Sequence, residues 1–536
     1  MNHSTVNILT LCDEMLLVIF NKLNNIDVLY SLIGVNRKLD RLARDITFTQ
    51  SLDLVTISSN KNNDSRNKSI LDRFCFDILP RIQHNIESLT LDPLLMDRVL
   101  RIENYSKLHK INLVIFQLEV ASRILNDESS IIHIFKDQIS HLTVTIKHDS
   151  RAVHRKKFFT NVFITVFIMF INLTYLHFDV KDMYLYSPIS LIDLPSTTCY
   201  SSSIVYLNVS VRNFDDCLCL LDGRLSQLHT LIVKVYLIQN TSMIINNTKT
   251  LSNLKCFSLI SFRRTIAIEY DNQILPLLRQ MSQLEKLTLY LIVRNRISFI
   301  DGTHLVNDIL SKMLYLHTFI FNIITGNVIM DAKFLPTPDD VVRPLIEKGY
   351  NVNCYTDYSD FSDGKCHIYS LPFTMDRMHI HSNKFAGGLF MTVRYLYLQD
   401  YVRSFEHDFF AGISRAFPLL DRLMIFNLTE QKKLTHQDEQ ETFSIIEFSH
   451  LTLLDLTMCY IDYVKQFLFD FNTRLPCLKT LYIKYEDLMI VTECFTNNAA
   501  RANCSKVELI IFVSKPMIYP ENFHLYFPFV VNKISS

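Results

Sequence analysis

One short apolar pattern recurs along most of the chain and constrains its fold more than any other feature. In each copy, an apolar residue is followed by two residues, a second apolar residue, one further residue and a third apolar residue. This spacing places the second and third apolar side chains on one face of a short β-strand. Clear copies are centred on Leu176, Leu231, Phe257, Leu287, Phe319, Leu396, Leu423, Leu454 and Leu481, and weaker copies on Leu89, Ile111, Leu142, Leu207 and Val507.

The distances between these copies are those of a repeat protein. Outside one long interval, from Phe319 to Leu396, the centres are on average roughly 28 residues apart, which resembles the unit length of leucine-rich repeats. Apolar residues at helical spacing lie between copies, as at Val464, Phe467 and Leu468. We expect an α/β fold in which a leucine-rich-repeat solenoid has a parallel concave sheet and outer helices. An ordinary α/β domain with similar strands is the alternative.

The first forty residues carry two apolar helical stripes. Leu16, Ile19, Phe20 and Leu23 form the first, and the second, Val28, Leu29, Leu32 and Val35, follows a break at Asn24 and Asn25. So short a segment cannot bury two such stripes by itself. Either the first repeats or another protein must cover them, so this segment is expected to be a binding module or a cap for the array.

Residues 11–39 resemble the F-box motif. Leu11, Asp13, Glu14, Met15 and Leu16 match its opening and Val35 and Arg37 match its end, whereas Cys12 replaces the usual Pro and Leu39 the usual Trp. An F-box before leucine-rich repeats is the order found in one F-box subfamily, and the chain resembles the divergent members expanded in some invertebrates.

The resemblance implies a non-catalytic substrate receptor of a Skp-cullin-F-box ubiquitin ligase. The N-terminal helices would bind the Skp-type adaptor and the repeats a target protein. The adaptor-binding residues implied are Leu11, Leu16, Ile19, Phe20, Leu23, Leu29, Leu32 and Val35. A repeat scaffold that binds a partner without any link to ubiquitin is the alternative.

The repeat strands also suggest where a target binds. If the Leu side chains point into the core, the residues between them face solvent, and Tyr, Phe and Arg are the types that anchor protein interfaces. The candidate substrate-binding residues are Tyr395, Tyr397, Arg422, Met424, Phe426, Tyr482 and Lys484, and Gln399, Asp455 and Thr457 are expected on the same face.

The expected organisation has five parts. Residues 1–50 form the F-box-like helical domain and 51–85 a linker helix or loop. Residues 86–321 and 393–536 form the two halves of the repeat array. Residues 322–392 are either an insertion or degenerate repeats, with possible centres at Val352 and Met378.

Composition excludes several other classes. Lys+Arg and Asp+Glu are both 54, so the balanced charge gives no reason to expect nucleic-acid or acidic-membrane binding. The 9 Gly form no phosphate-binding loop. The apolar run Val162–Ile171 is too short to span a bilayer and predicts a buried helix. No export signal is recognisable at the N-terminus, so we expect a cytoplasmic or nuclear protein with reduced cysteines.

Possible catalytic and metal-binding groups are few. His379 and His381 could form a metal pair, but we expect two solvent-facing histidines. Cys354, Cys366 and His367 fit no zinc spacing, and Cys217 and Cys219 fit neither a redox motif nor a metal clamp. No cofactor, metal or enzymatic activity is therefore expected.

Overall fold

In the computed structural model the chain is a mixed α/β protein that forms two units. It describes residues 8–55, 64–100, 105–115, 135–147, 156–181, 189–192, 194–195, 197–239, 253–329, 335–359, 363–432, 444–513 and 519–530. The first unit comprises residues 1–294 and 306–320, and the second comprises residues 295–305 and 321–536. Each unit is described by itself.

The first unit begins with a group of short helices, and the second, third and fourth of them are capped at their first residues by side chains. Its first four helices are α1 (Asp13–Phe20), α2 (Asn25–Leu32), α3 (Arg37–Ala43) and α4 (Ile46–Thr49). Asn24 Oδ1 accepts the Ile26 N–H at 2.9 Å, and Asn36 Oδ1 accepts the Leu39 N–H at the same distance. These bonds satisfy donors that a helix start leaves unpaired. The Asn24–Asn25 break therefore separates two helices, as the sequence predicts.

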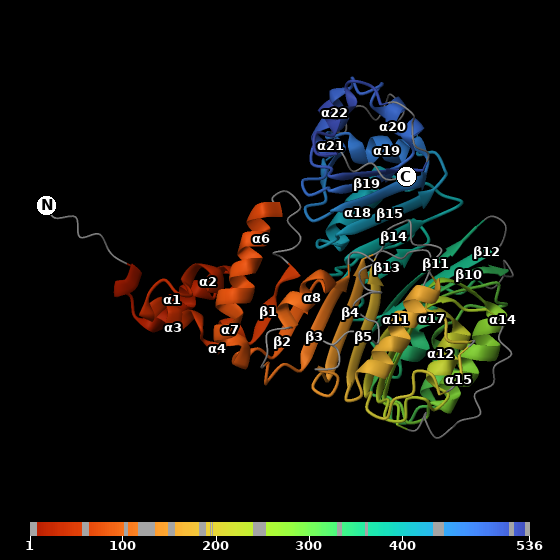
Figure 1. The fold of residues 1–536 in the computed structure, drawn as a ribbon. Helices are drawn as coiled ribbons and strands as arrows, with labels where there is room; N and C mark the ends of the chain where they lie inside the picture. Colours follow the sequence, from red (N-terminus) through yellow and green to blue (C-terminus); the bar gives the residue numbers. More distant parts are fainter. Residues whose placement is uncertain are drawn as a thin grey trace. The chain divides into compact units, whose positions relative to one another are not determined.

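Among the described residues of this unit, nine parallel strands follow, each paired with the next along the chain (Figure 1). They are β1 (Ser51–Asp53), β2 (Ser88–Leu91), β3 (Lys110–Ile115), β4 (His141–Lys147), β5 (Tyr175–Lys181), β6 (Tyr206–Asn213), β7 (Thr230–Leu237), β8 (Cys256–Ile266) and β9 (Lys286–Arg294). The helices of this part include α6 (Asp64–Arg73), α7 (Leu79–Ile82), α8 (Pro93–Leu100), α11 (Lys156–Met169), α12 (Phe214–Leu220), α14 (Ala267–Glu269) and α15 (Leu275–Gln280).

The predicted repeat centres form one buried column across these strands. Each centre pairs with the next, and none is more than 2% exposed. The column is Leu89, Ile111, Leu142, Leu176, Leu207, Leu231, Phe257 and Leu287. Leu52 of β1 pairs with Leu89 and adds a strand that the sequence analysis placed in a linker. The series of parallel strands therefore begins one strand earlier than predicted.

The apolar run at Val162 lies in α11. Phe163 and Val166 are both fully buried, as expected for a helix that packs on the sheet. Among the described residues, no helix has the length and apolar character needed to cross a membrane.

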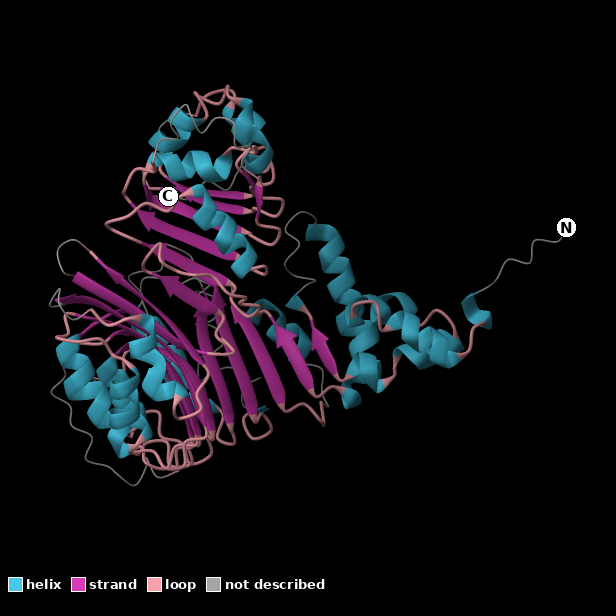
Figure 2. Cartoon of the chain, turned by 180° about the vertical axis from the view of Figure 1, so that it is seen from behind, coloured by secondary structure: helices cyan, strands magenta, loops and turns pink. Residues whose placement is uncertain are grey.

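The second unit contains an antiparallel hairpin and a second parallel sheet. In the hairpin region, β12 (Asp363–Ser370) pairs antiparallel with both β10 (Thr318–Ile329) and β11 (Val352–Tyr358). The parallel strands are β13 (Arg377–Ile380), β14 (Tyr395–Gln399), β15 (Arg422–Asn427), β17 (Leu453–Cys459), β19 (Thr480–Ile483) and β20 (Leu509–Phe512), and β16 (Ile446–Glu447) pairs with β18 (Thr473–Arg474). Figure 2 shows these strands in magenta.

The helices of the second unit are α16 (Gly302–Leu305), α17 (Pro338–Ile346), α18 (His407–Ala416), α19 (Ile461–Leu468), α20 (Tyr485–Val491), α21 (Arg501–Cys504) and α22 (Phe523–Tyr526). The last five contribute buried side chains to the core of the parallel sheet, whereas α17 packs on α16 and on β11. Val464, Phe467 and Leu468 of α19 are fully buried, so the helix predicted between these two strand patterns is confirmed. Phe471, which continues that pattern, lies beyond the helix and is 57% exposed.

The sequence left open whether residues 322–392 are an insertion or contain further copies of the strand pattern, and the structure contains one element of each kind. Met378 is fully buried on β13 and pairs with Leu396, so it is the centre of a further parallel strand. Val352 instead begins β11, an antiparallel strand. In this second sheet a separate column of buried centres runs from Met378 through Leu396, Leu423 and Leu454 to Leu481.

The last predicted centre is wrong by three residues. Leu481 pairs with Ile510, and Val507 lies before the strand. Val507 is therefore the first apolar residue of its pattern and Ile510 the second. Both are fully buried, so burial alone could not have distinguished the two registers.

Candidate functional site

The N-terminal helix α1 is apolar on two faces, and only one of them is covered. Leu16 is fully buried and Phe20 is 4% exposed. Met15, Val18 and Ile19 are 53%, 62% and 41% exposed. Together with Leu23, which is 54% exposed just beyond the helix, they form a stripe at the spacing of one helical face. We call Met15, Val18, Ile19 and Leu23 the outer face of α1.

Two ion pairs hold α1 against α3. The Asp13 carboxylate pairs with Arg41 and lies 3.5 Å from Lys38 Nζ. The Arg41 hydrogen bond lowers the pKa of Asp13, so this carboxyl group is ionised at neutral pH. Lys38 Nζ also donates to the Leu11 carbonyl oxygen at 2.6 Å. The outer face of α1 is thus carried on a helix with a defined orientation within the helical group.

The predicted adaptor-binding residues divide into three groups. Ile19, Leu23 and Val35 are exposed, and Leu11 and Leu32 are half-buried. Leu16, Phe20 and Leu29 form part of the core, which corrects their prediction as contact residues. The physical reason is that an apolar stripe does not reveal which of its members the chain itself covers. Met15 and Val18 were missed as contact residues, although their spacing with Ile19 was visible in the sequence.

The seven predicted substrate-binding residues lie on or beside the parallel sheet of the second unit. All seven side chains are half-buried, while the residues between them are core: Tyr395, Tyr397, Arg422, Met424, Phe426, Tyr482 and Lys484. The register joins Tyr395 to Arg422 and Tyr397 to Met424 on neighbouring strands. Tyr482 lies two strands from Met424, with Asp455 between them. We call this surface of β13, β14, β15, β17 and β19 the open face of the second sheet.

Three residues expected to face solvent are instead buried. Gln399 and Asp455 are 5% and 9% exposed, and His381 is 5% exposed. Strand β13 ends at Ile380, so the alternation no longer applies at His381. Asp455 Oδ1 accepts hydrogen bonds from Thr457 N at 2.9 Å and Thr457 Oγ1 at 2.7 Å. Burial raises the pKa of Asp455.

An aromatic ladder in the first unit was missed by the sequence analysis. His141, Tyr175 and Tyr206 pair in register on β4, β5 and β6. The rings of His141 and Tyr175 are stacked with centroids 5.4 Å apart, and those of Tyr175 and Tyr206 with centroids 4.3 Å apart. Each ring directly precedes a repeat centre, which is the signal that could have identified the ladder. Burial, together with Tyr175, raises the pKa of Tyr206 to about 12, so its hydroxyl remains protonated.

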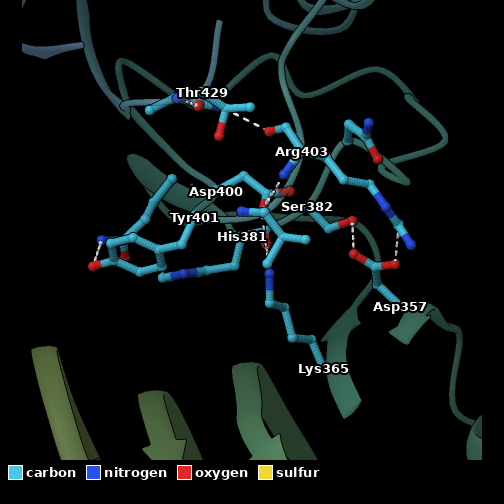
Figure 3. Close-up of polar contacts among 12 residues, drawn as sticks. Asp357, Lys365, His381, Ser382, Asp400, Tyr401, Arg403 and Thr429 are labelled. Atoms are coloured by element: carbon cyan, nitrogen blue, oxygen red, sulfur yellow. Dashed lines mark hydrogen bonds and ion pairs between the residues drawn. The ribbon is translucent and has the colours of Figure 1, made fainter. Parts of the chain in front are cut away.

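A buried polar cluster connects the antiparallel hairpin of the second unit to its parallel strands (Figure 3). From β11, Asp357 pairs with Arg403 and accepts from Ser382 Oγ at 2.6 Å. From β12, Lys365 Nζ lies 3.3 Å from Asp400 Oδ1 and donates to the His381 carbonyl oxygen at 3.2 Å. The cluster joins segments that follow β13 and β14 to both strands of the hairpin.

Asp400 organises the loop after β14. Its Oδ1 accepts the backbone N–H groups of Val402 at 3.0 Å and Arg403 at 3.3 Å, in addition to Lys365. The next strand end is held by Asn427, whose Nδ2 donates to the Arg403 carbonyl oxygen at 2.8 Å. Asn427 is fully buried and pairs with Cys459 on β17. A register shift between Met424 and Phe426 brings Asn427 and Cys459 opposite each other, although they lie at different distances from the buried centres of their strands.

His367 is the buried histidine with the clearest hydrogen-bonding pattern. Its Nε2 lies 2.6 Å from Asn322 Oδ1, and its Nδ1 lies 3.1 Å from the Tyr355 hydroxyl. A neutral ring meets both partners, with one nitrogen donating and the other accepting. Burial, and secondarily His379, lowers the pKa of His367 to about 3.

We expect this histidine to make the second unit less stable in acid. The unfolded chain binds the proton near pH 6.5 and the folded chain near pH 3, so its contribution is complete above pH 6.5 and is lost as the pH falls towards 3. The slope is at most about 1.4 kcal/mol per pH unit. His367→Gln should flatten the dependence of the urea midpoint on pH between 6.5 and 5, whereas His317→Gln, at a 68% exposed side chain, should not. Equal slopes for all three proteins contradict this assignment.

The cysteines singled out in the sequence as possible metal-binding or redox groups are buried. All 12 cysteines are free thiols, and eight of them are buried. Burial raises the pKa of Cys219 to about 11 and that of Cys217 further, so neither is a thiolate at neutral pH. In the part of the chain that is described, no three His, Cys, Asp or Glu side chains lie close enough together to hold a metal ion.

No protein-family model matches the chain, and no curated protein is significantly similar to it in sequence. We therefore infer function from the residues and contacts described above.

Proposed function

We propose that this chain is a non-catalytic substrate-recognition subunit of a Skp-cullin-F-box ubiquitin ligase, acting in the cytoplasm or nucleus. The outer face of α1 carries the proposal. This face is an apolar stripe within a segment that resembles the F-box. Burying a large apolar side chain is worth roughly 1.5–3 kcal/mol of free energy relative to leaving it in water. A partner that covers the stripe recovers this free energy.

The strand arrays support the second half of the proposal. We interpret the parallel strands, with their columns of Leu-type residues, as leucine-rich repeats that form a solenoid. Asn427 and Cys459 occupy equivalent places at the ends of neighbouring strands, as the Asn or Cys of such repeats does. In this interpretation the repeats hold a target protein near the ligase, and catalysis by the other subunits depends on proximity.

The adaptor contact can be tested with substitutions that spare the core. Val18→Asp combined with Ile19→Asp places two charges on the outer face of α1 and should reduce adaptor binding at least about 100-fold, because central apolar contacts dominate interface energies. Co-purification of the Skp-type adaptor with the full chain is the measurement. Ile46→Asp is the matched control, since Ile46 is 51% exposed on α4 and outside the stripe.

Leu16→Asp and Phe20→Asp are unsuitable for this purpose. Both side chains are buried, so a charge there should unfold the helical group as well as remove any contact. Circular dichroism distinguishes the two effects. Wild-type levels of adaptor with the Val18→Asp and Ile19→Asp double variant would remove the ligase proposal.

A repeat scaffold without a link to ubiquitin is the second candidate. It is favoured by the departure at Cys12, which is the N-cap residue of α1 and makes no side-chain capping bond. In that case the adaptor should not bind the wild-type protein, while substitutions of Tyr397 or Phe426 should abolish binding of another partner.

A further inference from the structure

Two arginines on the open face of the second sheet are arranged around one tyrosine. Arg377 of β13, Tyr395 of β14 and Arg422 of β15 are paired in register and form one row across three neighbouring strands. The guanidinium carbon of Arg377 lies 4.8 Å from the centroid of the Tyr395 ring, and that of Arg422 lies 5.0 Å from it. Both distances are within the range of cation–π attraction. The tyrosine therefore fixes both guanidinium groups before any ligand binds.

The side chains in this row are packed along the sheet yet still reach its surface. The Arg377 and Arg422 side chains are 23% and 20% exposed. Tyr397 and Met424, in the next row of the same strands, are half-buried. Two oriented cations thus lie next to an aromatic and a thioether side chain, a combination suited to binding a polypeptide.

The charge of this area is positive. Between Arg377 and Ile380, Tyr395 and Gln399, and Arg422 and Asn427, the strands contain the two arginines and no carboxylate. Burial, and secondarily Arg377, lowers the pKa of His379 to about 3, so its ring is neutral at pH 7.

Two carboxylates that precede the strands each form an ion pair with one of the arginines. Asp376 lies 3.5 Å from Arg377 Nε, and Asp421 lies 3.5 Å from Arg422 Nε. The other oxygen of Asp421 accepts the Thr452 hydroxyl at 2.5 Å. Asp455, which follows Met424 in the register, is buried and bonded to Thr457, so the positive area ends at β15.

We propose that the row Arg377–Tyr395–Arg422 binds an extended acidic segment of the target protein. This proposal depends on the proposed function, because it names the class of target that the repeats would hold. Guanidinium groups bind carboxylates through paired, charge-assisted hydrogen bonds. Arg377 and Arg422 lie on the strands either side of Tyr395, so they are two strand spacings, about 10 Å, apart. A segment in the polyproline II conformation rises about 3.1 Å per residue with three residues per turn, so one turn spans this distance. Two carboxylates separated by two residues lie on the same side of such a segment, with Tyr397 and Met424 contacting the part between them.

Selection from a random-peptide library on the full chain tests the proposal. We expect enrichment of peptides with two acidic residues separated by two others. The best selected peptide, labelled with fluorescein, should bind at least ~10-fold more weakly to the Arg377→Gln and Arg422→Gln double variant, as measured by fluorescence anisotropy. Its affinity for the wild-type protein should fall as salt is added.

The matched control removes the same charge from the helical side. Arg415 of α18 is exposed, and the Lys465 side chain of α19 is 45% exposed. Arg415→Gln combined with Lys465→Gln should leave peptide affinity unchanged. Tyr395→Leu, which keeps both charges but removes the ring between them, should weaken binding, and Tyr395→Phe should not.

Three results would overturn the proposal. The first is a selection that yields no enrichment of acidic peptides, and the second is equal peptide affinity for the arginine variant and its control. The third is a single-stranded oligonucleotide that binds the wild-type protein in place of the peptide but does not bind the arginine variant. Adaptor co-purification separates this inference from the ligase proposal. The arginine variant should retain the adaptor, and the variant of the outer face of α1 should retain the acidic peptide.

Discussion

Replacing Phe523 and Phe527 together by Ala is expected to unfold the carboxyl-terminal edge of the second unit. Both side chains are fully buried, and the Phe523 ring lies 5.3 Å from Phe495 and 5.0 Å from Phe527. Each Phe→Ala change in a core costs about 3–5 kcal/mol, so the pair approaches the whole stability of a typical domain, about 5–15 kcal/mol. The chain contains no Trp, so urea unfolding followed by far-ultraviolet circular dichroism is the suitable measurement.

The neighbouring Phe529 provides the control. It is 64% exposed, and Phe529→Ala should change the free energy of unfolding by no more than about 0.5 kcal/mol. The contrast has a structural cause: residues 519–530 cover the end of the core beyond β20, the last strand of its sheet. A small effect of the double substitution would mean that this segment does not act as a cap.

Lys365→Met is expected to destabilise the second unit by about 3–5 kcal/mol, the usual cost of removing one partner from a buried ion pair. The Asp400 side chain is fully buried, whereas the Lys365 side chain is 17% exposed. Among the described residues, Asp400 Oδ2 has no hydrogen-bond partner, so loss of Lys365 leaves a poorly compensated charge inside the cluster. Urea unfolding of the full chain measures the loss.

A second substitution tests whether charge is the cause. Asp400→Asn keeps an oxygen for the Val402 and Arg403 N–H groups and removes the buried charge. The Lys365→Met and Asp400→Asn double variant should therefore be more stable than Lys365→Met alone. If the two losses simply add, the pair contributes through packing and its charges are not coupled.

The two surfaces differ in how far the sequence could predict them. Alternation placed Tyr395, Tyr397 and Arg422 correctly on the open face of the second sheet, since a strand allows only two side-chain directions. A helix surface offers no such binary choice. The stripe predicted for α1 therefore included Leu16 and Phe20, which are buried in the structure, and omitted Val18, which is exposed.

The buried polar cluster was outside the reach of sequence analysis. Asp357, Lys365 and Asp400 belong to two antiparallel strands and a loop, and nothing in their spacing along the chain indicates that they meet. The same is true of His367 and Asn322: His367 Nε2 lies 2.6 Å from Asn322 Oδ1, although the two residues are far apart in the chain. Such contacts depend on which strands pair, and antiparallel pairing of β10, β11 and β12 interrupts the parallel order on either side.

The sequence by itself determined the order of most of the parallel strands and, except at the last strand, which apolar residue of each predicted strand lies at the centre of the column, because each centre can be buried only when its neighbours are in line with it. It also indicated helices between some of these strands, such as α19. Only the tertiary structure decided which face of α1 remains uncovered, where the parallel order gives way to a hairpin, and that Arg377 and Arg422 meet the same ring. These outcomes depend on contacts between distant segments, whose free energies are set by packing and charge pairing rather than by local periodicity.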